Sequence, residues 1–148
     1  MIDVESTVDQ TNPAMTPAGA SLVPDAERMT FLPRFFGLHH LLKGEFLVYG
    51  WMGNLCQDYS GGFWNFYTLK NGGFYMAPAG AKRLRVMCCG NGFDGEMSAE
   101  AAGIVATLFT LSQLSFETEL DRFSDLFHAL RAFAASHLEA SAILSAID

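Results

Sequence analysis

The residues with the chemical character of a reactive site lie together in the middle of the chain. Cys88 and Cys89 are adjacent, glycines follow at positions 90, 92 and 95, and Asp94 and Glu96 lie among them. A thiolate can act as a nucleophile, and a pair of carboxylates can transfer protons. The spacing G-x-G-x-x-G can cradle a phosphate when a strand precedes it and a helix follows.

The glycine motif fits a turn better than a nucleotide site. Asp94 and Glu96 would repel a pyrophosphate, and no P-loop lysine follows the glycines. We therefore interpret residues 90–96 as a glycine-rich turn that leads into a helix. Solvated turn carboxylates are far more common than proton-transfer pairs, so we interpret Asp94 and Glu96 as surface residues of the turn. The alternative interpretation is an enzyme that uses this pair in acid–base catalysis.

The cysteines and histidines lack the partners that catalysis or metal binding requires. Cys88 and Cys89 are neighbours on an expected strand, so their side chains point to opposite faces, and structural roles are favoured. His39 and His40 have no ligand spacing around them, which predicts one half-buried and one solvated ring. The sequence therefore predicts no catalytic, cofactor-binding or metal-binding residue. The alternative of an enzyme includes one that uses Cys88 or Cys89 as its nucleophile.

An aromatic β-hairpin is the strongest local pattern around this region. Residues 63–69 are aromatic and apolar with polar breaks at Asn65 and Thr68, Lys70-Asn71-Gly72-Gly73 supplies a tight reversal, and residues 74–77 resume as a second strand. Residues 83–89 predict a third strand, with leucine and valine on one face and two arginines on the other.

Helices are predicted at 44–58, 99–116, 119–135 and about 139–146, with Ser98 as the N-cap of the second. Gly50 and Gly53 in the first helix indicate close packing against a neighbour. Pro33 disfavours helix at the preceding residue, so 22–42 is expected to be irregular, with a helical turn at 25–31. The predicted fold class is α+β, with a small antiparallel sheet of at least three strands, arranged as a meander, packed against about four helices.

Length and composition indicate one globular domain. The chain has 148 residues, of which 50% are hydrophobic and 17% are charged, so it can bury a core without disulfides. We expect a flexible N-terminal tail at 1–21 and a single domain at 22–148. No apolar run is long enough for a membrane span, no secretory signal is evident, and the cysteine number is odd, which predicts free thiols in a reducing compartment, the cytoplasm. We expect the protein to be a monomer.

Charge is unevenly distributed along the chain. The net charge is −7. Residues 33–93 carry two acids and six bases, whereas residues 94–148 carry nine acids and two bases. The overall sign predicts at most weak or indirect binding to nucleic acid, because phosphate contacts need clustered lysine and arginine. The acids are too few and too mixed with apolar stripes to predict a full mimic of DNA.

Several motifs together resemble the ArdB/KlcA antirestriction family. They are Tyr49-Gly50-Trp51-Met52, Tyr59-Ser60-Gly61-Gly62-Phe63-Trp64, Phe66-Tyr67-Thr68-Leu69, Asn71-Gly72-Gly73-Phe74-Tyr75-Met76-Ala77-Pro78, Gly90-Asn91-Gly92-Phe93 and Ala101-Ala102-Gly103-Ile104. The resemblance covers roughly residues 22–148. The Cys88-Cys89 pair and Leu138 depart from the family pattern.

This resemblance implies a small cytoplasmic protein, of a plasmid or another mobile element, with a mixed α and β fold. Its expected function is to counter type I restriction endonucleases and so protect incoming unmodified plasmid or phage DNA. The expected mechanism is a non-enzymatic interaction, direct or indirect, with the type I restriction-modification complex. The alternative is the enzyme described above, acting on DNA or on a host factor.

Turns and helix ends are the expected places for partner contact, because the strands and helices use most apolar residues in the core. Asp94 and Glu96 lie in the glycine-rich turn, and Asp148 places its carboxylate at the negative end of the last helix. That placement opposes the helix dipole by ~0.3–1 kcal/mol. We therefore predict Asp94, Glu96 and Asp148 as partner-binding residues.

Overall fold

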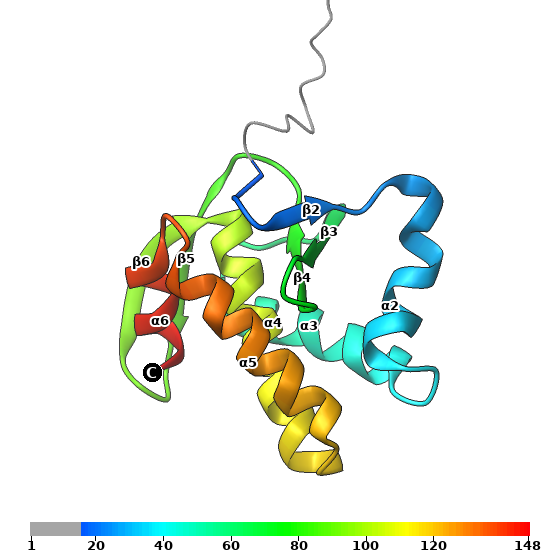
Figure 1. Ribbon diagram of the computed structural model, residues 1–148. Coiled ribbons are helices and arrows are strands. Elements are labelled where there is room, and N and C mark those ends of the chain that lie inside the picture. The colour runs from blue at the N-terminus through cyan, green and yellow to red at the C-terminus, as the bar shows by residue number, and fades with distance from the viewer. Residues whose placement is uncertain (1–15) are drawn as a thin grey trace, which may run out of the picture.

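The computed structural model describes residues 16–148 and shows an α+β protein (Figure 1). One antiparallel sheet has the strand order β2-β3-β4, with β2 at Ala20–Leu22, β3 at Trp64–Leu69 and β4 at Phe74–Pro78. A second contains β5 at Arg83–Cys88 and β6 at Phe93–Ser98. The helices are α2 at Arg28–Phe36, α3 at Leu41–Leu55, α4 at Ala99–Thr118, α5 at Asp121–Ala135 and α6 at Ala140–Ile147, with a 3-10 turn, η2, at Asp25–Glu27. The predicted fold class is confirmed.

The predicted meander is wrong in one respect, because its strands belong to two sheets. The hairpin of β3 and β4 has its predicted boundaries to within one residue. The third strand of that sheet is β2, whereas β5 pairs with β6. Residues 93–98, most of which were expected to be a turn, form β6. Of the predicted tail, 1–15 lie outside the described residues, and Ala20 and Ser21 begin β2.

Helix α2 continues through Pro33, contrary to the expected irregular path. A proline removes one helical hydrogen bond, and here the carbonyl that loses its donor belongs to Met29. Met29 is 90% exposed, so water can hydrate that carbonyl. On the opposite face three phenylalanines pack against the ring of Phe74, with centroid distances of 5.5, 4.6 and 5.4 Å; they are Phe31, Phe35 and Phe36. Burial of these rings outweighs the single lost bond.

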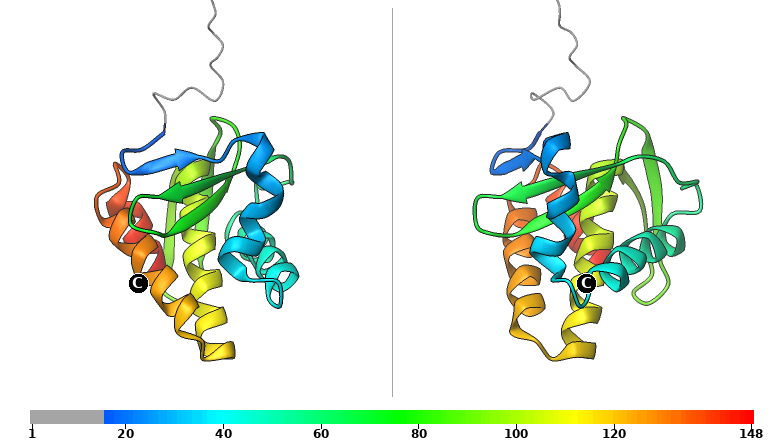
Figure 2. Two further views of the ribbon diagram at one scale, coloured as in Figure 1. Left: turned by 45° about the vertical axis from the view of Figure 1, so that its right-hand side comes forward. Right: turned by 90° about the vertical axis from the view of Figure 1, so that its right-hand side faces the viewer.

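Helix α4 forms the centre of the core, with both sheets and helices α3, α5 and α6 around it (Figures 1 and 2). Among the described residues it is the one helix that is long and apolar enough to cross a membrane, yet 67% of its most apolar stretch is buried inside the protein. At Gly103 an added Cβ would lie 2.3 Å from the Cβ of Ala77. Thr107 Oγ1 accepts from the Met76 N–H at 3.3 Å, and its one hydroxyl proton lies between the carbonyls of Gly103 at 2.8 Å and Met76 at 3.3 Å, so Thr107 covers the free edge of β4.

The glycines of α3 do not have the packing role predicted for them. A Cβ added at Gly50 or Gly53 would meet no atom within 4 Å, so both lie on an open face of the helix. The close approach occurs instead at Gly44, where a Cβ would lie 2.4 Å from the ring of Phe36. Trp51 joins α3 to α4 by stacking on Phe109, with ring centroids 4.6 Å apart.

Candidate functional site

The β5–β6 hairpin presents charged residues on its outer face and apolar residues toward the core. Leu84 and Val86 on β5 and Met97 on β6 are buried, and the intervening positions are exposed or half-buried. The antiparallel register places Arg85 opposite Glu96 and Arg83 opposite Ser98. Because side chains alternate along a strand, both arginines and both acids of the hairpin share its outer face.

Arg85 and Asp94 form the strongest charge pair on this face. Arg85 Nε lies 2.8 Å from Asp94 Oδ1, and its Nη2 lies 2.6 Å from Oδ2, so two parallel hydrogen bonds join the guanidinium and the carboxylate. The hydrogen bonds and charge of Arg85 lower the pKa of Asp94, and those of Asp94 raise the pKa of Arg85. Arg83 Nε lies 4.0 Å from Glu96 Oε1, a looser and more exposed pair.

The turn of the hairpin is fastened to the last helix. Asn91 Oδ1 accepts a hydrogen bond from the Phe93 N–H at 2.9 Å, and Asn91 Nδ2 donates to the carbonyl of Ala146 at 2.8 Å. Gly92 has φ +77, a left-handed conformation that glycine adopts without strain. The turn is therefore held in one position relative to α6.

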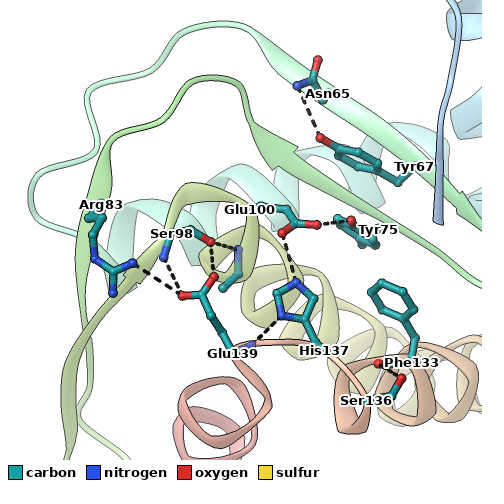
Figure 3. A network of polar contacts seen from close by, with 11 residues as sticks. Asn65, Tyr67, Tyr75, Arg83, Ser98, Glu100, Phe133, Ser136, His137 and Glu139 are labelled. Atoms are coloured by element: carbon teal, nitrogen blue, oxygen red, sulfur yellow. Dashed lines mark hydrogen bonds and ion pairs between the residues drawn. The ribbon is translucent and has the colours of Figure 1, made fainter. Parts of the chain in front are cut away.

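A polar network fixes the other end of the hairpin (Figure 3). Ser98 Oγ accepts from the Ala101 N–H at 3.0 Å, which confirms it as the N-cap of α4, and donates to Glu139 Oε2 at 2.5 Å. The Ser98 N–H donates to Glu139 Oε1 at 3.0 Å, and Arg83 Nη1 lies 3.8 Å from the same oxygen. Glu139 thus ties the last residue of β6 to the first residue of β5 and to the start of α6.

A second part of the network lies deeper. The Glu139 N–H donates to His137 Nδ1 at 2.9 Å, so a neutral His137 carries its proton on Nε2, which lies 3.0 Å from Glu100 Oε1. The hydroxyl of Tyr75 donates to the other oxygen of Glu100. The His137 side chain is only 3% exposed, and Tyr75 is fully buried. The network therefore connects β4 of one sheet to the hairpin of the other.

The titration of these groups indicates a structural role for the deeper part. Burial raises the pKa of Tyr75 far above its ordinary value, and the charge of Glu100 and its hydrogen bond raise it further. Partial burial acts to raise the pKa of Glu139, but the hydrogen bonds from Ser98 and the nearby His137 and Arg83 outweigh it, and the pKa is lowered. An ionised Glu139 is thus held in place, and Tyr75 stays protonated as a donor.

The structure brings together only two of the three predicted partner-binding acids. Asp94 and Glu96 lie on the same outer face, each beside an arginine. Asp148 lies at the end of α6, where its Oδ1 is 3.8 Å from Arg131 Nη2 on α5. This neighbouring cation offsets the unfavourable helix-dipole position of Asp148.

The structure also shows how far the histidines and cysteines considered above are buried. His39 is exposed, whereas His40 is half-buried against the edge of Phe123 at 5.4 Å, as predicted. Cys88 is half-buried and Cys89 exposed, and both are free thiols. Burial raises the pKa of Cys56 to about 11, with a smaller effect from Asp58, so this thiol remains protonated at neutral pH.

Sequence reasoning missed strand β6 and the network behind it. The dipeptide Asn91-Gly92 between two segments of alternating polarity was the available signal for the hairpin. The joining of Glu100, His137 and Glu139 left no local signal, because these residues meet only when α4 and the α5–α6 connection pack together.

Fold and site together define a small α+β protein that displays a charged hairpin on a rigid polar support. A family profile described as antirestriction protein matches residues 57–148. Two proteins of Escherichia coli, each described as antirestriction protein KlcA, are 55% and 53% identical to this chain. The alignments cover 90% and 89% of this chain and 95% and 96% of the relatives. The protein YafX of E. coli K12 is 43% identical, with 85% of each chain covered.

A solved structure agrees with these sequence relationships. It superposes with a TM-score of 0.82 at 53% identity, covering 90% of this chain and 96% of the other. The KlcA and ArdB proteins are described as having a novel fold and antirestriction activity against type I DNA restriction systems in vivo but not in vitro. The chain belongs to the antirestriction protein family.

Proposed function

We propose that this protein counters type I restriction systems in the cytoplasm, by non-enzymatic contact, and so protects unmodified plasmid or phage DNA. The observation that carries the proposal is the relationship to KlcA, 55% identical over 90% of the chain, together with the shared fold. Since KlcA and ArdB are described as active in vivo but not in vitro, the proposed contact with the restriction machinery, direct or indirect, depends on conditions inside the cell.

The proposed contact surface is the outer face of the β5–β6 hairpin, with Asp94 and Glu96, and the end of α6 with Asp148 as a separate element. Acids and arginines alternate on the hairpin, which differs from the unbroken row of carboxylates that a DNA mimic would need. A surface of both signs fits a protein partner with its own paired charges, and it makes the association sensitive to salt.

The geometry favours contact over catalysis by Asp94. Its carboxylate is held ionised and is engaged by Arg85 through both oxygens, so it is poorly placed to donate or accept a proton near neutral pH. The cysteine alternative has its own test: Cys88→Ser and Cys89→Ser are each expected to retain full protection in cells.

The test of the surface is plating of unmodified phage on cells that carry a type I restriction system. The double variant Asp94→Asn, Glu96→Gln is expected to reduce protection at least about tenfold, since a loss of ~1.4 kcal/mol of contact free energy weakens binding about tenfold. Asp148→Asn is tested alone. Glu117→Gln, an exposed carboxylate paired with Lys43 at the end of α4, is the matched control and is expected to protect like the parent.

Two results decide the proposal. Cross-linking from the hairpin in challenged cells should recover a component of the restriction machinery, and the double variant should lose that product. Full protection by a double variant with parental melting temperature would place the working surface elsewhere.

A further inference from the structure

A pocket beside helix α2 has no part in the site described above. It has a volume of about 310 Å³ and is lined by residues of α2, α3, β3 and the loop before β3, namely Arg28, Tyr49, Tyr59, Gly62, Phe63 and Trp64. A volume near 300 Å³ is at the small end of the range for ligand pockets. Its lining combines four aromatic rings with one cation, Arg28.

The aromatic walls are held in fixed positions. Trp64 Nε1 donates to the hydroxyl oxygen of Tyr59 at 2.8 Å, and the rings of Tyr49 and Tyr59 meet Trp64 edge-on at 5.1 and 5.9 Å. The Tyr49 hydroxyl donates to Glu45 Oε2 at 3.0 Å. The hydroxyl hydrogen of Tyr59 makes no bond to any residue that the structure describes. A ligand thus meets preformed walls and one donor.

Phe63 lines the pocket with a largely exposed ring. Its side chain is 60% exposed although it is a large apolar ring. The two residues before it, Gly61 and Gly62, have φ of +95 and +126, conformations that residues with a Cβ rarely adopt. With Arg28 over one face of the ring, this exposure leaves Phe63 accessible to a ligand in the pocket.

Arg28 supplies the charge. Its guanidinium carbon lies 4.4 Å from the centroid of Phe63 and 4.2 Å from that of Phe66, so both rings orient it. No carboxylate among residues 16–148 forms an ion pair with Arg28. The N–H groups of an oriented arginine without an acidic partner suit an anion with oxygen acceptors, and its charge repels an ammonium ligand.

We propose that this pocket binds one nucleotide unit, with the base stacked among the aromatic rings and the phosphate on Arg28. A planar ring joined to an oxyanion satisfies both halves of the lining, and stacking of bases on aromatic rings and arginine planes is how proteins hold unpaired nucleotides. The volume admits one unit. The source is either a free nucleotide or an unpaired residue of a single strand. This site is independent of the proposed antirestriction surface.

The two tryptophan indole N–H resonances of the full-length protein report binding directly. Trp64 lines the pocket and Trp51 packs on Phe109 elsewhere, so Trp51→Phe assigns the two signals. The probes are deoxyadenosine monophosphate, a short oligodeoxyadenylate, the same strand in a duplex, and an acidic peptide with one phenylalanine. The nucleotide or the single strand is expected to shift the Trp64 resonance, whereas the duplex is not.

Variants identify the contacts. Phe63→Ala is expected to weaken binding by about 5- to 150-fold, the range for removing a base-stacking ring. Arg28→Gln should weaken it as well and abolish the salt dependence, which for one phosphate on a single strand has a log–log slope of about −0.7. The controls are Phe46→Ala, an exposed ring of α3, and Arg34→Gln, an arginine of α2 stacked on Phe35 at 4.8 Å.

The outcomes separate the sources and the proposal from its rivals. Equal affinity for the mononucleotide and the strand identifies a free nucleotide, and tighter binding of the strand identifies an unpaired residue; both support the proposal. No shift at millimolar nucleotide, binding that survives Phe63→Ala and Arg28→Gln in folded variants, or binding of the acidic peptide alone would overturn it.

Discussion

The two hairpins of this protein share an asparagine–glycine pair in the turn and differ in what covers them. In each, an asparagine–glycine pair makes the reversal, with Gly72 at φ +92 and Gly92 at φ +77. In each, the asparagine oxygen accepts from the N–H two residues on, and its amide donates at 2.8 Å to a helix carbonyl. The pairs are Asn71 with Ala129 of α5 and Asn91 with Ala146 of α6.

The faces of the hairpins differ. Strand β4 is covered on both sides, with the rings of α2 against Phe74 and helices α4 and α5 against Ala77 and Tyr75. Strands β5 and β6 are covered on one side only, and their open side carries the Arg85–Asp94 and Arg83–Glu96 pairs. The first hairpin is part of the core, whereas the second packs on the core with one face and exposes the other to solvent. Substitutions should therefore change stability in the first and activity in the second.

The largest effect on stability is expected from Gly103→Ala, where α4 meets β4. The new Cβ would lie 2.3 Å from Ala77 Cβ and 2.4 Å from its Cα, so backbone has to move. We expect a loss of about 3 kcal/mol in the free energy of unfolding, the upper end for overpacking, measured by urea denaturation. Gly50→Ala is the matched control of opposite sign, because its Cβ meets nothing within 4 Å and alanine favours the helix by about 1 kcal/mol.

The next largest effect is expected from Glu100→Ala. It removes the acceptor of both Tyr75 and His137, two donors that are almost fully buried. Each buried donor left without a partner costs ~1–3 kcal/mol, and because the Glu100 side chain is 22% exposed and water can partly replace it, the lower end for each donor gives a loss of about 2 kcal/mol. The same assay should show nearly no change for Glu117→Ala in the exposed part of α4. Equal stability of the two variants would mean that the network does not support the hairpin.

A smaller and pH-dependent effect is expected from Glu139→Gln. The folded protein lowers the pKa of Glu139 from its ordinary value of 4.5, so the stabilisation is present above that value and is lost as the pH falls through the folded pKa. The parent should therefore be more stable than the variant at pH 7, and the difference should shrink in acid. Chemical denaturation at several pH values measures this. Glu96→Gln, on the outer face of the same hairpin, is the control.

The first hairpin was predictable from sequence because its aromatic strands and Asn71-Gly72 turn indicate the same structure. The Ser98 cap of α4 and the boundaries of α4, α5 and α6, predicted to within two residues, also follow from local pattern. Strand β6 was not recognised, because Asp94, Gly95 and Glu96 have low strand propensity, and only pairing with β5 makes them a strand. Helix α2 was missed because tertiary burial of its rings outweighs the local effect of Pro33.

The candidate site was predictable only in part. Asp94 and Glu96 were selected for charge in a turn, and the structure places them on the outer face of a strand beside two arginines. The support behind them joins residues separated by 37 and 41 positions, and no local pattern encodes such a contact. The pairing of Asp148 with Arg131 likewise depends on how α5 and α6 pack.

The smallest effect on stability, and the sharpest test of the comparison, is expected from exchanging the charges of the Arg85–Asp94 pair. Arg85→Asp alone places a third carboxylate beside Asp94 and Glu96, so it loses the pair and adds repulsion. The exchange Arg85→Asp, Asp94→Arg restores a pair across the same two strands with its direction reversed.

If the pair serves only to hold the hairpin, the exchange regains parental protection of unmodified phage. We expect the exchange to restore the melting temperature but not the protection, because binding to a charged partner depends on which charge lies at each position. Melting curves and plating efficiency, measured on the single variant, the exchange and the parent, distinguish these results, and recovery of both would return the hairpin to a purely structural role.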